Sequence, residues 1–111
     1  MALRCYVLDD QGNPVPCDVL TWGRWMEAAD TYRLRTIAKD RDEGPGADPV
    51  EVSTVFLGLD HNYRGSGPPV LWETLVFGGP LDGTQRRYDS RDAALRGHQA
   101  ICRLVRKSSK R

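Results

Sequence analysis

Two apolar runs near the middle of the chain constrain its fold more than any other feature. The first, "VEVSTVFLGL", covers residues 50–59, and the second, "VLWETLVF", covers residues 70–77. Both are rich in the β-branched and aromatic residues that favour strands. Apolar side chains occupy both alternating faces of each run, so each strand needs cover on two sides. The sequence therefore predicts two neighbouring central strands, with helices over one face and a second copy or a guest molecule over the other.

Shorter strands are predicted on either side of this pair. The stretch "RCYVLDDQGNPVPCD" predicts a hairpin whose turn uses Gly12 and Asn13. Charged and apolar residues alternate over residues 33–40, which indicates an amphipathic or edge strand. The segment "QRRY", residues 85–88, indicates a short last strand. We therefore expect a sheet of about five strands.

Two segments have the periodicity of amphipathic helices. Apolar residues recur at three- and four-residue steps over residues 19–31, and Asp18 stands where an N-cap belongs. A second helix is predicted over residues 91–106 after Ser90, with His98 on its apolar side, where a hydrogen-bonded core histidine is expected. Strands with one helix after the first hairpin and another at the end indicate an α+β domain. We expect an antiparallel sheet with both helices packed on one face.

The length and composition indicate one globular domain. The chain has 111 residues, of which 40% are hydrophobic and 28% charged, and its net charge is +1. Residues 1–106 are expected to form the domain, and residues 107–111 a basic, disordered tail. No run approaches the roughly 20 apolar residues of a membrane helix, and the N-terminus has no apolar signal core. We therefore expect a cytoplasmic protein with no membrane partner and without nucleic acid as its ligand.

The cysteines and histidines do not have the spacing of a metal site. Cys5, Cys17 and Cys102 are odd in number and widely spaced, which is typical of reduced, buried thiols. A disulfide between Cys5 and Cys17 is the alternative if the two face each other across the hairpin. His61 and His98 are far in sequence from any cysteine pair, so neither a metal nor a cofactor is predicted.

Glu73 interrupts the second apolar run and needs an explanation. A carboxylate on a core-facing strand position costs several kcal/mol unless it is paired. An ion pair with Arg86 or Arg87 of the next predicted strand, or with a basic residue of the preceding one, is the structural interpretation. The functional interpretation makes Glu73 a polar group on the floor of a cleft, where it binds a ligand.

The segment "QRRY" is the strongest candidate for ligand binding. Guanidinium groups, an aromatic face and the start of a helix together suit a phosphate-bearing, nucleotide-like ligand. The glycine pair of "FGGP" leaves backbone N–H groups free to approach an anion. The alternative is a solvated strand edge with one arginine paired to the glutamate. The candidate residues are Glu73, Gly78, Gly79, Arg86, Arg87 and Tyr88.

The segment "LDHNY" places Asp60 and His61 beside each other in the predicted loop. A general acid–base role for His61, oriented by Asp60, is chemically possible. The alternative is a turn capped by Asp60 and Asn62, with His61 exposed. No GxSxG, HExxH, P-loop or GxGxxG motif is present, so no catalytic residue is predicted and we expect a non-enzymatic protein.

Four segments carry a resemblance to a known family. They are "CYVLDDQGNPVPCDVLTWGRWMEAAD", "VSTVFLGLDHNY", "GPPVLWETLVFGGPLDG" and "RRYDSRDAALRGH", in that order. With these segments, the chain resembles a family of small proteins that are encoded widely in bacteriophages and prophages. The resemblance covers residues 4–105. Family members often have Phe in place of Trp72 and Met in place of Leu75, which keeps both positions apolar. The resemblance implies a phage accessory protein and carries no catalytic residue over.

These observations lead to one main hypothesis and three rivals. We expect a phage-encoded binding protein, a homodimer or higher oligomer, that modulates the host or its anti-phage defence by sequestering a nucleotide-like signal. The first rival is a protein–protein module that inhibits a host protein through tryptophan anchors. The others are a virion component and a small hydrolase. The anchors of the first rival are Trp22, Trp25 and Trp72, and the hydrolase would use Asp60, His61 and Glu73.

Overall fold

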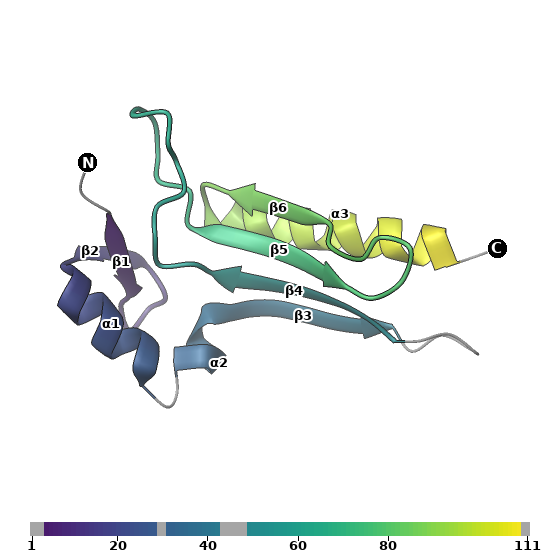
Figure 1. Ribbon diagram of the computed structural model, residues 1–111, viewed down its shortest axis with the longest axis horizontal. Coiled ribbons are helices and arrows are strands. Elements are labelled where there is room, and N and C mark those ends of the chain that lie inside the picture. Colours follow the sequence, from purple (N-terminus) through teal and green to yellow (C-terminus); the bar gives the residue numbers. More distant parts are fainter. Residues whose placement is uncertain (1–3, 29–30, 43–48, 110–111) are drawn as a thin grey trace.

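The computed structural model describes residues 4–28, 31–42 and 49–109 and shows an elongated α+β protein, 48 × 33 × 23 Å (Figure 1). Its strands form two antiparallel sheets, one of two strands and one of four. The elements, in chain order, are β1 (Cys5–Leu8), β2 (Pro14–Cys17), α1 (Val19–Glu27), α2 (Thr31–Arg35), β3 (Thr36–Asp42), β4 (Val50–Phe56), β5 (Trp72–Phe77), β6 (Gln85–Tyr88) and α3 (Arg91–Ser109).

The larger sheet has the strand order β3-β4-β5-β6, so each strand pairs with its neighbours in sequence. β4 and β5 are the central pair, in register from Glu51 opposite Phe77 to Phe56 opposite Trp72. The prediction that the two apolar runs are neighbouring central strands is confirmed. Both strands are shorter than predicted. β4 ends at Phe56, because Gly58 takes a φ of +79° and turns the chain soon after it, and β5 begins at Trp72.

Helix α3 covers one face of this sheet, as its position behind the strands shows in Figure 1. Alternate residues of β4 and β5 point toward it and are buried, among them Val52, Phe56 and Val76. The buried side of α3 repeats at three- and four-residue steps, as the sequence predicts. Its residues are Ala94, His98, Ile101, Cys102 and Val105.

The N-terminal elements form a separate unit at one end of the sheet (Figure 1). The β1–β2 hairpin reaches the chain beyond β4, where the Tyr6 N–H donates to the Gly58 carbonyl at 2.7 Å. Trp25 of α1 packs edge-on against Phe56, with ring centroids 5.9 Å apart. The predicted α+β class with antiparallel strands is confirmed, and the arrangement of the strands and helices differs from the predicted single sheet of about five strands with two helices on one face. The hairpin is its own two-stranded sheet, and α3 alone covers the larger one.

The helix boundaries differ from the predicted ones at two places. α1 stops at Glu27, and a short helix, α2, occupies the start of the predicted strand 33–40. Thr31 fixes this break, because it is buried and its hydroxyl donates to the Trp25 carbonyl. α3 continues to Ser109, so part of the predicted disordered tail is helical. Residues 43–48 of the predicted central loop and residues 110–111 of the tail lie outside the described residues.

The helix caps and the thiols agree with the sequence. Asp18 accepts from the Thr21 N–H at 2.7 Å, and Ser90 caps α3 in the same way. Cys5 and Cys17 lie directly opposite each other in the hairpin, and both are free thiols. Within the three described segments, no helix has the length and apolar character needed to cross a membrane.

Gly97 sets the distance between α3 and the sheet, and this gives a first prediction. A Cβ at Gly97 would lie 2.2 Å from the Tyr88 ring. Although alanine favours helices, we expect Gly97→Ala to lower the free energy of unfolding by about 1–3 kcal/mol, because the ring or the helix must shift. The measurement is urea denaturation followed by circular dichroism.

Gly23, in α1, provides the matched control. Nothing lies within 4 Å of a Cβ added there, so Gly23→Ala should raise stability by about 0.5–1 kcal/mol. Equal effects of the two substitutions would show that Gly97 is not a close-approach position.

Candidate functional site

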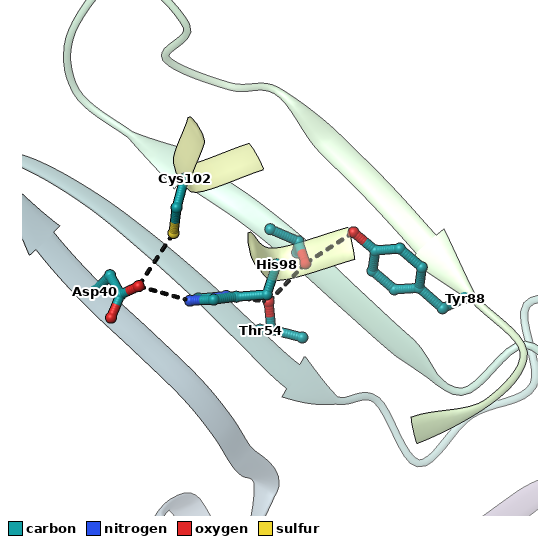
Figure 2. A network of polar contacts seen from close by, with 6 residues as sticks. Asp40, Thr54, Tyr88, His98 and Cys102 are labelled. Atoms are coloured by element: carbon teal, nitrogen blue, oxygen red, sulfur yellow. Dashed lines mark hydrogen bonds and ion pairs between the residues drawn. The ribbon is translucent and has the colours of Figure 1, made fainter. Parts of the chain in front are cut away.

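A chain of polar side chains crosses the interface between α3 and the larger sheet (Figure 2). The Tyr88 hydroxyl lies 3.0 Å from Thr74 Oγ1, which lies 2.5 Å from Thr54 Oγ1. Thr54 Oγ1 lies 2.7 Å from His98 Nδ1. At the far end, His98 Nε2 lies 3.3 Å from Asp40 Oδ2. The two threonines and the histidine are buried, so each polar atom depends on the next one for a partner.

One set of hydrogen positions satisfies the chain from Tyr88 to His98 Nδ1. With a proton on His98 Nε2, the Nδ1 atom accepts from the Thr54 hydroxyl. Thr54 then accepts from Thr74, and Thr74 accepts from Tyr88. His98 Nε2 makes no hydrogen bond of good geometry, although it lies 3.3 Å from Asp40 Oδ2.

The Asp40 end of the network also includes Cys102. Cys102 Sγ donates to Asp40 Oδ2 at 3.1 Å, and it lies one helical turn after His98. This hydrogen bond is the main reason why the pKa of Asp40 is lowered, with partial burial opposing it and His98 assisting. Burial, and then the bond to Asp40, raise the pKa of Cys102 to about 12. His98 and Cys102 are 1% and 3% exposed, whereas the Asp40 side chain is 55% exposed.

A cavity of about 380 Å³ opens beside this end of the network. Asp40 and Cys102 both line it, together with Val52, Val105 and two arginines. The arginines are Arg41 and Arg106. The cavity therefore gives solvent and small solutes access to the carboxylate and the sulfur.

The two ends of the network differ in what they can do chemically. Asp40, His98 and Thr54 are linked in the order of a carboxylate–histidine–hydroxyl triad. Thr54 has no exposed surface, however, so its hydroxyl cannot reach a substrate. The inner residues Thr54 and Thr74 therefore have a structural role. The Asp40–Cys102 end borders the cavity and is the part that a solute could approach.

Glu73 forms the ion pair that the sequence predicts. Its Oε2 accepts from Arg87 Nε at 3.0 Å and from Gln85 Nε2 at 2.7 Å. Arg87 is directly opposite Glu73 in the β5–β6 register. Both lie on the face of the sheet away from α3, so the carboxylate is explained by its neighbours in the sheet.

The remaining residues of the "QRRY" segment lie on the other face. Successive strand residues point to opposite faces, so Arg86 and Tyr88 face the α3 side while Arg87 faces away. Tyr88 uses its hydroxyl for Thr74. The structure therefore does not bring Arg86, Arg87 and Tyr88 together around one ligand.

The glycine pair makes a turn at the end of β5. Gly78 and Gly79 have φ values of +91° and +73°. The Gly78 N–H donates to the Asp82 carboxylate at 2.7 Å, so it is not available to an anion. A Cβ on either residue would lie 2.7 Å from an atom of Pro49 or Val50. Tight packing and turn geometry account for both glycines.

Asp60 and His61 organise the loop between β4 and β5. Asp60 Oδ1 accepts from the Asn62 and Val70 N–H groups at 2.8 and 2.9 Å. His61 Nδ1 donates to the Leu59 carbonyl at 2.8 Å. The turn-capping alternative for Asp60 is confirmed. The hydrolase hypothesis needs Asp60, His61 and Glu73 close together. In the described part of the chain, no hydrogen bond or ion pair joins Asp60 or His61 to Glu73.

The face of the larger sheet opposite α3 is a second candidate surface, which we call the uncovered face. Val55, Leu75 and Phe77 form a diagonal apolar strip on it, and Phe77 is 47% exposed. Two ion pairs flank this strip. They are Lys39–Glu51, at 3.6 Å, and Arg87–Glu73, at 3.0 Å.

Sequence reasoning missed most of the buried network. It identified His98 as a hydrogen-bonded core histidine, which is confirmed. Cys102 follows His98 by four residues, a helical spacing that places both on one side. Thr54 and Thr74 occupy inward positions of the central strands. Asp40 had no such signal, because its position opposite Val52 depends on the β3–β4 register.

No family model, curated protein or solved structure matches the chain. The resemblance to phage and prophage proteins therefore stays a prediction. Two parts of the molecule are candidate sites: the Asp40–Cys102 end of the buried network, and the uncovered face.

The hydroxyl of Thr54 gives a second prediction. Thr54→Val keeps the shape of the side chain but leaves His98 Nδ1 without a donor and the Thr74 hydroxyl without its acceptor in a buried site. We expect the free energy of unfolding to fall by about 1–3 kcal/mol, measured by urea denaturation. Thr21→Val, at an exposed position of α1, is the control and should change stability little. An effect of Thr54→Val no larger than that of the control would contradict the buried chain.

The Cys102 thiol gives a third prediction, about pH. The pKa of Cys102 is about 12 in the folded protein and 9.0 ordinarily, so the folded state holds this proton more tightly. That stabilisation is fully present below pH 9 and is lost as the pH rises toward 12. Between pH 9 and about 11, we expect the free energy of unfolding to fall more steeply in the wild-type protein than in Cys102→Ala. Parallel curves for the two proteins would contradict a buried Cys102 thiol whose pKa is raised in the folded protein.

Proposed function

We propose that this chain is a non-enzymatic accessory binding protein of a bacteriophage, which docks onto a host protein through the uncovered face. The observation that carries the proposal is the layout of that face. An apolar centre of Val55, Leu75 and Phe77 is bordered by charged residues that are already paired. An apolar core inside a polar rim is the anatomy of a non-obligate protein interface. The resemblance to phage and prophage proteins supports the phage setting.

A protein partner fits the geometry better than a nucleotide-like ligand. Arg87 is engaged by Glu73, and Arg86 and Tyr88 lie on the opposite face. The Gly78 N–H is engaged by Asp82. The groups that would bind a phosphate therefore do not converge on one point. The apolar strip of the uncovered face, in contrast, is continuous.

The tryptophans do not supply the anchors of this interface. Trp72 is 4% exposed and packs against Phe56, with ring centroids 5.7 Å apart. Trp25 packs on the other side of Phe56, and Trp22 packs against Gly58. The anchors are therefore Leu75 and Phe77, which face away from this aromatic cluster.

The rim of the uncovered face suits a host protein with a polar rim of its own. Lys39 on edge strand β3 is paired with Glu51, and Arg87 on edge strand β6 is paired with Glu73. Polar groups of this kind stay in contact with solvent at the rim of a non-obligate interface, while the apolar centre is buried. A partner with an apolar patch and a polar rim therefore complements the face.

The test is quantitative co-purification followed by titration of the recovered partner. The tagged protein is incubated with host lysate, and the stoichiometric partner is identified, purified and titrated against the variants. We expect Leu75→Lys and Phe77→Lys each to weaken binding at least about tenfold, because each puts a charge in the apolar centre. Leu104→Lys, at a half-exposed position on α3, is the matched control and should bind as the wild-type protein does.

The other outcomes count against the proposal in different ways. Partner binding that survives Leu75→Lys and Phe77→Lys would place the interface elsewhere. A stable homodimer in light scattering that Leu75→Lys dissociates would make the face a self-interface, the oligomer that the sequence predicts. Calorimetric binding of a nucleotide that Arg86→Ala abolishes would restore the small-ligand hypothesis.

A further inference from the structure

We propose that Asp40, His98 and Cys102 form a binding site for a divalent transition-metal ion, with zinc as the best-suited ion. The three residues come from edge strand β3 and from two successive turns of α3. One ligand atom from each, a carboxylate oxygen, a ring nitrogen and a sulfur, lies within 4.8 Å of the other two. This site is independent of the proposed docking surface, which lies on the opposite face of the sheet.

An unsatisfied nitrogen points to a ligand at this position. His98 Nε2 is buried and has no hydrogen bond of good geometry, although it lies 3.3 Å from the Asp40 carboxylate. Buried polar atoms are nearly always satisfied in native proteins, and an exception often marks an ion or water. The Asp40 oxygen lies beside both this nitrogen and the Cys102 sulfur, and the nitrogen and the sulfur lie within 4.8 Å of each other.

Two of the three distances between donor atoms are close to those of a tetrahedral site. Zinc bonds of about 2.0–2.3 Å at tetrahedral angles separate neighbouring ligand atoms by about 3.4–3.6 Å. The Asp40 oxygen is already 3.3 Å from the His98 nitrogen and 3.1 Å from the Cys102 sulfur. The half-exposed Asp40 side chain is free enough to withdraw by the few tenths of an ångström that an ion requires.

The rest of the network orients the histidine as a metal ligand. A histidine that binds metal through one ring nitrogen usually hydrogen-bonds through the other, which fixes the ring. Here Nδ1 lies 2.7 Å from Thr54 Oγ1, and Thr54 is held by Thr74. With metal on Nε2, the Nδ1–H donates to Thr54, and the threonine hydroxyls turn to donate away from the histidine.

The charges balance for a divalent ion. In the metal-free protein the Cys102 thiol donates its proton to Asp40. Binding replaces that proton with the metal, releases the proton to solvent and displaces water from the ion. The thiolate and the carboxylate then neutralise the two positive charges, with a neutral imidazole as the third ligand. The adjoining cavity is lined by charged residues of both signs, so water suits the fourth position.

The experiment uses the reduced, metal-free, full-length protein and Zn²⁺ or Co²⁺ alone as probes. Zn²⁺ is titrated against a chromophoric chelator, and Co²⁺ is followed by absorption. We expect one ion per chain and a sulfur-to-cobalt charge-transfer band. Cys102→Ala should remove that band and weaken Zn²⁺ binding at least about tenfold, and Asp40→Asn should also weaken it.

Cys17→Ser is the matched control, because it removes a thiol of the hairpin and leaves the site intact. It should keep both the band and the stoichiometry. The proposal is overturned if Cys102→Ala binds Zn²⁺ as the wild-type protein does, or if Cys17→Ser is the variant that loses the band. It is also overturned if the folded wild-type protein binds no stoichiometric ion. Asp40 is half exposed, so Asp40→Asn tests the site without disturbing the core.

Discussion

His98 is the residue on which the packing of this protein depends. It is a titratable ring enclosed between α3 and strands β4 and β5. Burying an unpaired polar group would oppose folding, and the penalty is greater in the low dielectric of a core. The threonine pair on the central strands provides a partner for Nδ1, and the carboxylate on β3 lies 3.3 Å from Nε2. Helix α3 therefore has one position on the sheet in which the ring meets both groups.

The same network fixes the position of α3 along the sheet. Val52 and Val76 pack with Ile101 and Val105 at one end, and Phe56 and Trp72 pack with Ala94 at the other. Apolar contacts of this kind tolerate small shifts of a helix along a sheet. The polar atoms between the two clusters do not tolerate them, because hydrogen bonds depend on distance and angle. Gly97 allows Tyr88 to lie directly against the helix and complete the chain.

The sequence predicts local features well because their causes are local. The caps at Asp18 and Ser90 and the turn at Asp60 each depend on side chains within a few residues, and all are present. The two central strands follow from their own composition. The Glu73–Arg87 pair was predictable because a carboxylate in an apolar run needs a partner on an adjacent strand.

The features that could not be predicted depend on register. A strand side chain changes face when its register slips by one residue, so "TIAKD" alone does not say whether Lys39 or Asp40 meets α3. A register shift within β3, between Thr36 and Ala38, decides the answer and turns Asp40 toward α3. For the same reason "QRRY" suggested one cluster, whereas its members alternate between the faces. Residue types indicate which chemistry is available, and strand register decides which groups meet.

Strand β3 links the two surfaces that carry the proposals. Asp40 points toward α3 and the cavity, while its neighbours Lys39 and Arg41 belong to the rim of the uncovered face. β3 is an edge strand that pairs only with β4 within the described sheet, so its position depends partly on the bonds that Asp40 makes to α3. A metal ion held by Asp40, His98 and Cys102 would tie this edge to the helix more firmly than a thiol hydrogen bond does.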